Sequence, residues 1–213
     1  MPFASHPEDL TLHGVRVLGF ATAARIAGRY GLEPAQVDET LLDLEVLGLV
    51  RRQNVRGDRA WSLTEAGRAD DTRRMAAELA AAGDGAAVAV RSVHRMFVPV
   101  NERFGQACTD WQLRPSRVDP LDVNDHTDPR WDDRVLDRLA SLGSALGVFC
   151  DELAASLIRF GAYGALYSAA LRHVEAGRHS WVDAPDRDSL QLVWMQFHED
   201  LIATLGIERG AEV

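Results

Sequence analysis

The stretch between Thr22 and Gly67 constrains the fold more than any other part of the sequence. Gly31 follows a short helical segment, at a position where glycine often supplies the left-handed backbone that ends a helix. Pro34 suits the first turn of a second helix, because the N–H that proline lacks has no helical partner there. One buried face is predicted for that helix from the helical spacing of Val37, Leu41, Leu44 and Leu47.

A β-hairpin is predicted directly after this pair of helices. Residues 49–52 and 60–63 have the composition of short strands, and the turn between them contains Gly57, which suits a hairpin. Thr64 can cap a long, charged helix that runs to about Ala82. Residues 7–20 are predicted to form a further helix ahead of the pair.

At these residues the chain resembles the winged helix-turn-helix domains of bacterial transcription regulators, above all the MarR-like family. The resemblance lies in residues 22–27, 37–47, 47–50 and 63–67, which include Leu47-Gly48-Leu49-Val50 and Leu63-Thr64-Glu65-Ala66-Gly67. It implies a regulator that binds double-stranded DNA as a homodimer. Winged helices also serve as protein-interaction modules, so the same resemblance leaves that second function open.

The resemblance places the second helix of the motif in the major groove, with the hairpin beside it. Gln36, Glu39 and Thr40 would then reach base edges or a phosphate. Arginines would supply the phosphate neutralisation on which affinity depends. The candidates for this role are Arg25, Arg29, Arg51, Arg52, Arg56 and Arg59.

The distribution of charge argues against DNA binding. Residues 1–80 contain 10 Arg and 12 Asp or Glu, and residues 81–213 contain 13 Arg and 20 Asp or Glu, with no Lys in the chain. A DNA-binding domain usually carries a basic surface. Phosphates would repel the four acidic residues of the predicted recognition helix, Asp38, Glu39, Asp43 and Glu45. A protein-interaction module that does not bind DNA is therefore the alternative.

The rest of the chain is predicted to be entirely helical. A small, glycine-rich segment at residues 81–86 is the predicted boundary between a domain at 1–82 and a bundle of four to five helices at 87–213. The first predicted helix spans 87–112, and Pro99 should kink or split it. A second helix is predicted to start at 128–129. Two more are predicted over about 151–175 and 189–205. Residues 113–127 and 178–187 are predicted loops. The fold class is thus mainly α, and the bundle would supply dimer contacts or an effector pocket.

A weaker resemblance covers part of this bundle. Residues 97–104, Cys108-Thr-Asp-Trp111 and Asn124-Asp-His-Thr-Asp-Pro129 look like helical segments of actinobacterial proteins usually called regulators. Similar segments follow phosphoenolpyruvate-utilising enzyme modules. This resemblance implies, as an alternative to a DNA-linked sensor, an accessory that binds such an enzyme.

Aromatic residues mark the candidate ligand site. Most lie on helical stripes and are core residues first, but an apolar pocket between bundle helices is a common effector site. The candidates are Trp111, Trp131, Tyr163, Tyr167 and Trp194. The run from Asn124 to Trp131 either caps the following helix or lines a ligand or partner site.

Catalytic and metal signatures are missing from the sequence. It has no glycine-rich phosphate loop, no nucleophile motif and no helical His pair at the i, i+4 spacing of a metal site. Its two cysteines, Cys108 and Cys150, are predicted to be reduced core residues. We therefore predict no enzyme activity, no metal and no cofactor. No apolar run approaches the ~18 residues of a membrane span, and the N-terminus does not resemble a signal peptide. The predicted location is the cytoplasm, with no membrane contact.

Overall fold

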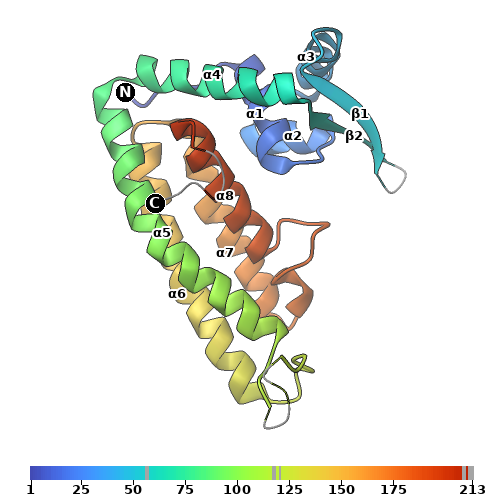
Figure 1. Ribbon diagram of the computed structural model, residues 1–213, viewed down its shortest axis with the longest axis vertical. Helices are drawn as coiled ribbons and strands as arrows, with labels where there is room; N and C mark the ends of the chain where they lie inside the picture. Colours follow the sequence, from blue (N-terminus) through green and yellow to red (C-terminus); the bar gives the residue numbers. More distant parts are fainter. Residues whose placement is uncertain (56–57, 117–118, 120, 208–209, 211–213) are drawn as a thin grey trace.

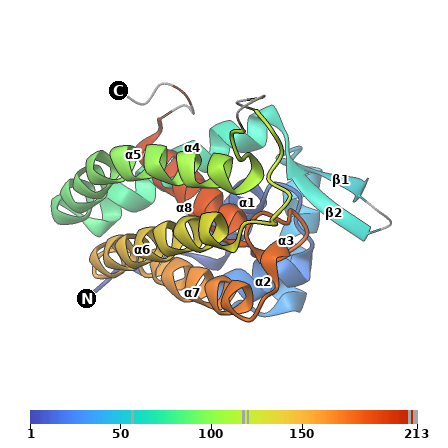
Figure 2. The same ribbon diagram turned by 90° about the horizontal axis from the view of Figure 1, so that it is seen from below.

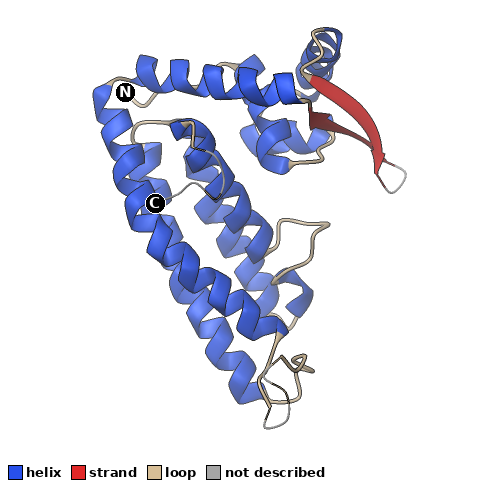
Figure 3. Cartoon of the chain, in the orientation of Figure 1, coloured by secondary structure: helices blue, strands red, loops and turns tan. Residues whose placement is uncertain are grey.

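The computed structural model describes residues 1–55, 58–116, 119, 121–207 and 210. The chain is mainly helical with one two-stranded antiparallel sheet, as predicted for its fold class (Figures 1 and 3). The N-terminal part contains α1 Pro7–Leu18, α2 Ala23–Tyr30, α3 Pro34–Val46, β1 Val50–Val55 and β2 Asp58–Leu63. The remainder contains α4 Glu65–Ala82, α5 Asp84–Gln112, α6 Pro129–Ala154, η1 Ile158–Gly161, α7 Ala162–Glu175, η2 His179–Trp181 and α8 Leu190–Leu205.

Local signals set the ends of α2 and α3. The Thr22 hydroxyl caps α2 by accepting from the Arg25 N–H, and Gly31 ends the helix with a φ of +66°. The apolar face of α3 is buried as predicted, with Leu41 fully enclosed. Leu47 is an exception: α3 ends at Val46, and the Leu47 side chain is 67% exposed instead of buried.

The hairpin is longer than the sequence predicts. Its strands pair from Val50 with Leu63 to Val55 with Asp58. Ala21, in the short segment before α2, exchanges two backbone hydrogen bonds with Trp61 of β2. These bonds attach the hairpin to the pair of helices, so α3 and the hairpin lie next to each other at one end of the molecule (Figure 1).

Helix α4 connects the N-terminal part to the bundle (Figure 1). It begins after Thr64, whose hydroxyl accepts from the Gly67 N–H, as predicted. The predicted boundary segment at 81–86 is not an extended linker. Only Gly83, with a φ of +91°, separates α4 from α5, so the chain turns a corner between two long helices.

One helix of the bundle differs from the prediction. Helix α5 ends at Gln112 as predicted, and of the two outcomes predicted at Pro99, a kink or a split, the split does not occur. The helix predicted over about 151–175 is interrupted instead, because α6 ends at Ala154 and α7 begins at Ala162. The Phe3 N–H donates to the Ser156 carbonyl, and the Ile158 N–H donates to the Phe3 carbonyl. The N-terminal segment therefore pairs with the chain where a continuous helix would have run.

Two apolar clusters form the core. The smaller one lies among α1, α2, α3 and the hairpin, and the larger one fills the bundle, where Phe104 stacks on Trp194 with ring centroids 4.2 Å apart. Cys108 and Cys150 are buried, unpaired members of the larger cluster, which confirms their predicted core role. Figure 2 shows the bundle helices packed together, with the hairpin projecting away from them. Within the described ranges, no helix is both long enough and apolar enough to span a lipid bilayer.

Candidate partner-binding face and the charge network behind it

The outer face of α3 is exposed, acidic and partly apolar. Val37, Leu41 and Leu44 are buried on the inner face, which turns the intervening positions towards solvent. On that outer face Leu42 is 45% exposed, and Val46 at the end of the helix is 88% exposed. Single exposed apolar residues are common, but Leu42 and Val46 lie on one helix, and the exposed Leu47 follows directly at its C-cap.

The carboxylates of this face differ in their pairing. Glu45 binds Arg52 of β1, with 2.6 Å between its Oε2 and the arginine Nη2. Asp38, Glu39 and Asp43 are exposed, and no ion pair joins them to any other described residue. The outer face therefore presents three carboxylates whose charge the described part of the chain does not neutralise.

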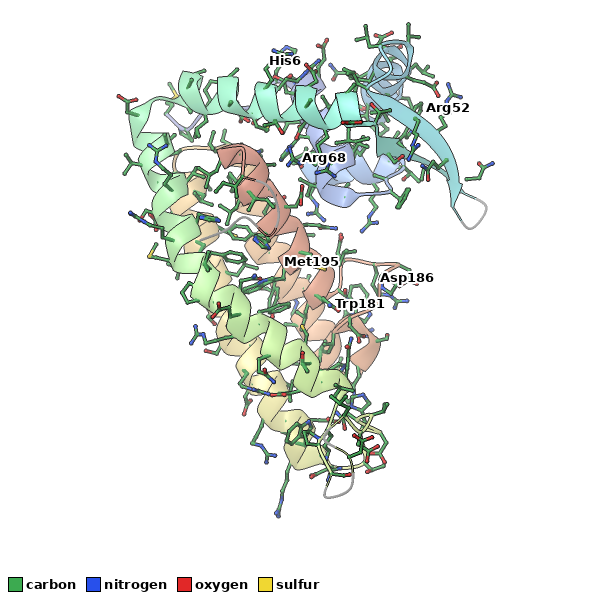
Figure 4. All side chains as sticks on the ribbon, viewed as in Figure 1. His6, Arg52, Arg68, Trp181, Asp186 and Met195 are labelled. Carbon is green, nitrogen blue, oxygen red and sulfur yellow. The ribbon has the colours of Figure 1, made fainter. Side chains whose placement is uncertain are left out.

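A hollow of about 390 Å³ lies between this face, the start of α2 and the hairpin. Its lining is formed by Thr22, Ala23, Ala24, Asp38, Leu42, Arg52 and Trp61. The Arg52 guanidinium lies 5.1 Å from the centre of the Trp61 ring, so it covers that ring while it binds Glu45. Figure 4 labels Arg52 beside the hairpin.

The arginines predicted to contact phosphates are mostly occupied within the chain. Arg25 and Arg29 of α2 both bind Asp188, which precedes α8, at 3.1 and 3.0 Å. Arg29 is buried and also donates to Gln196 at 2.7 Å, so its side chain is not on the surface as a phosphate contact requires. Arg51 is exposed and makes a long hydrogen bond of 3.4 Å to Ser62.

The other predicted DNA contacts have mixed positions. Gln36 and Glu39 are exposed, and Thr40 is half-buried. Arg56 and the side chain of Arg59 lie outside the described residues. The predicted set is therefore divided between the exposed face of α3, the hairpin and a buried contact with the bundle.

Behind α2 and α3, a buried network of charges joins the N-terminal part to the bundle. His13 of α1 lies between two carboxylates, with Nδ1 3.1 Å from Asp71 of α4 and Nε2 3.1 Å from Asp200 of α8. All three side chains are fully buried. Burial alone would lower the pKa of His13, but the two carboxylates outweigh it and raise this pKa to about 9.

Arginines complete the network. Arg16 binds Asp71 at 3.0 Å, and Arg159 binds Glu78 at 3.0 Å and Asp200 at 3.2 Å. Burial alone would raise the pKa of Asp200, but the charges of Arg159 and His13 hold it well below its usual range. Protonated His13 and the two arginines thus pair with the buried carboxylates of Asp71, Glu78 and Asp200, and Arg16 also binds the largely buried Glu199 at 2.8 Å, so these buried charges are paired.

Four of the five aromatic ligand candidates, Trp111, Tyr163, Tyr167 and Trp194, are buried in the bundle core. Tyr163, Tyr167 and Trp194 are at most 1% exposed. The Tyr163 hydroxyl donates to Asp200 at 2.8 Å, and the Tyr167 hydroxyl donates to the Leu139 carbonyl at 2.9 Å. None of the three lines any of five surface hollows found among the described residues. The prediction that they line a ligand pocket is not supported by their positions.

The run from Asn124 to Trp131 caps α6 and also lines a hollow. Asp128 accepts from the Arg130 N–H at the start of the helix, as predicted. His126 has a left-handed φ of +56°, and its Nδ1 lies 3.0 Å from the buried carboxylate of Asp132. With Trp111 it borders a hollow of about 410 Å³ at the far end of the bundle, and Trp131 borders another.

Metal coordination has no support from these side chains. Within the described ranges, no three His, Cys, Asp or Glu side chains are placed to hold a metal ion.

The buried network was not among the predictions made from the sequence. Its only local signal is a charged or titratable residue on an apolar stretch, such as His13 and Arg16 within α1 or Asp200 after Phe197. Such a signal does not identify a partner, because each pair joins helices that are far apart in the chain.

No protein-family model, curated protein or solved structure matches this chain.

Proposed function

We propose that this chain is a regulatory binding protein of the winged-helix type, and that it contacts a protein partner through the outer face of α3. The order α2, α3, β1 and β2 supports the winged-helix assignment. The charge of α3 supports a protein partner over DNA. An accessory role beside a phosphoenolpyruvate-utilising enzyme, implied by the weaker resemblance, is one form of such a partnership.

The observation that carries this proposal is the state of the charges around α3. Asp38, Glu39 and Asp43 are exposed without a described ion partner, whereas Arg25 and Arg29 are bound to Asp188. DNA affinity arises mainly from neutralised phosphates. A duplex laid against α3 would meet carboxylates, and the nearby arginines would first have to leave their partners.

The second candidate function is a homodimeric, DNA-binding transcription regulator with an effector-responsive bundle. The hairpin favours it, because Arg51 and Arg52 are exposed on β1 and the sequence adds Arg56 and Arg59 at the turn. Arginines on a wing can enter a narrow minor groove. Sedimentation of the whole chain at micromolar concentration tests whether it forms a homodimer. A monomer at that concentration would contradict this part of the second candidate function.

One titration distinguishes the two functions. The full chain is mixed with random genomic duplex fragments while salt is raised from about 50 to 200 mM. A protein-binding module retains no fragment even at the lowest salt. Retention that falls steeply with salt, with a shared sequence among the retained fragments, would overturn the proposed function.

Asp43→Asn sharpens this experiment. If α3 lies against DNA, the substitution removes a repelled charge and strengthens binding to any duplex. If α3 faces a protein, the variant still retains no DNA. Asp133→Asn, at an exposed site on α6, is the matched control.

A further inference from the structure

Building on the proposed function, we infer that the hollow beside α3 binds one apolar side chain of a basic protein segment. Basic residues on either side of that side chain would contact the outer carboxylates of α3. The partner chemistry is thus a short segment, rich in Lys or Arg, that carries one exposed large apolar residue.

The floor of the hollow is the reason to expect an apolar side chain from the partner segment. Ala23, Ala24, Leu42 and Trp61 contribute apolar surface to it. Thr22 offers little polar chemistry there, because its hydroxyl already caps α2. A volume of about 390 Å³ accommodates a large aliphatic or aromatic side chain with room for water.

The carboxylates at the rim of the hollow are the reason to expect basic residues in the partner segment. Asp38 borders the hollow, and it lies four residues before Leu42, so the two share one side of α3. Glu39 and Asp43, also four residues apart, form the adjacent strip. Arg52, on the opposite wall, is already bound to Glu45 and does not neutralise this strip.

The exposed apolar residues extend the surface towards the end of α3. Val46 and Leu47 are more than half exposed, which adds apolar area beyond the hollow. A purely electrostatic ligand would leave this area in water. A segment that combines basic residues with an apolar one covers both kinds of surface, which is the mode by which amphipathic segments bind grooves.

A duplex is a poor occupant of the same hollow. Phosphate sites in proteins are built from arginine, lysine and backbone N–H donors. Among the described lining residues the only cation is Arg52, which is engaged by Glu45.

The test uses the full chain labelled with ¹⁵N and a synthetic peptide of about 12 residues, with alternating Lys and Ala around a central Leu. Two matched peptides replace the central Leu by Ser or every Lys by Glu. We expect the first peptide to shift the amide signals of Ala23, Ala24 and Leu42. Either change in the peptide should weaken binding about tenfold, a difference of about 1.4 kcal/mol.

Substitutions in the protein identify the surface. Leu42→Ser and the pair Asp38→Asn with Asp43→Asn should each weaken binding severalfold. Asp133→Asn with Asp151→Asn on α6 removes the same charge from a distant, exposed surface and should leave binding unchanged. Circular dichroism of each variant verifies that the fold is intact.

The outcomes separate the two proposals. Equal binding of the Leu and Ser peptides, or shifts confined to the acidic segment at 119–133, would overturn this inference and leave the proposed protein partner in place. A DNA duplex that shifts the amides of α3 in a salt-dependent way would overturn both.

Discussion

His13 should make the stability of this protein fall between neutral and mildly alkaline pH. Its pKa is raised from 6.5 to about 9 by Asp71 and Asp200. A folded-state pKa above the unfolded value means that the folded chain holds an extra proton between the two values. The stabilisation is therefore complete below about pH 6.5 and is lost as pH rises towards 9.

The magnitude follows from the pKa difference. Each pKa unit corresponds to about 1.4 kcal/mol, so the full change is about 3 kcal/mol. Between pH 6.5 and 8.5 the expected loss is about 2 kcal/mol, because the proton difference between the folded and unfolded chain is less than one at both ends of this window. This window isolates His13 from the buried thiols of Cys108 and Cys150, whose pKa values burial raises to about 12, so that they affect stability only nearer pH 9.

Urea unfolding at several pH values within this window measures the effect. The midpoint for the natural chain should fall steadily with pH, whereas His13→Gln should start lower and remain level. Because that variant leaves buried carboxylates less well paired and can fail to fold, the ring of His13 should also be titrated by NMR in the natural chain. A level midpoint together with a His13 titration near pH 6.5 would refute the reasoning.

Three glycines give sharper packing tests, each measured by thermal unfolding. Gly67→Ala would place a Cβ 1.9 Å from the Leu49 carbonyl oxygen, and because backbone must move, we expect a loss of more than about 3 kcal/mol. Gly143→Ala would place a Cβ 2.4 Å from the buried ring of Tyr167, which should cost about 1–3 kcal/mol; an unchanged melting temperature would contradict this packing. Gly105→Ala meets nothing within 4 Å on the exposed side of α5 and should stabilise by about 0.5–1 kcal/mol, which makes it the control.

The parts of the fold that sequence analysis predicted are those with local causes. Gly31, Thr64 and Asp128 mark helix ends through their own backbone or side-chain chemistry, and the structure confirms all three. The break after α6 was not predictable in this way, because its backbone pairs with Phe3, which is about 150 residues away in the sequence. At Pro99 the predicted split does not occur, since the proline lies within the continuous helix α5, and the alternative prediction of a kink stays a prediction.

The same distinction applies to the candidate site. Helical spacing identified the outer face of α3 and its acidic residues, because both depend only on positions within one helix. The pairing of Arg29 with Asp188 and Gln196 depends on how the bundle packs against α2. Sequence alone therefore placed Arg29 on a DNA-contacting surface, where its burial does not allow it to act.

Helix α1 bears on whether residues 1–82 form an independent domain. Leu12 and Val15 of this helix pack in the smaller apolar cluster, whereas Val17 packs in the bundle cluster. The polar side chain of His13 lies at the boundary and reaches Asp200 of α8. Cutting the chain after Ala82 would remove that partner and expose the surface of α1 and α4 that α8 covers.

We therefore expect the fragment 1–82 to be much less stable than the same residues in the full chain. The stability gap should include the apolar contacts of α8 and the part of the His13 contribution that depends on Asp200, since Asp71 stays in the fragment. Circular dichroism melts of the fragment and the full chain measure it, and Trp61, the one tryptophan in the sequence of 1–82, adds a fluorescent reporter for the fragment. A fragment that melts cooperatively at the temperature of the full chain would show that the charge network does not couple the two parts. A partner bound at α3 could then influence the bundle only by some other route.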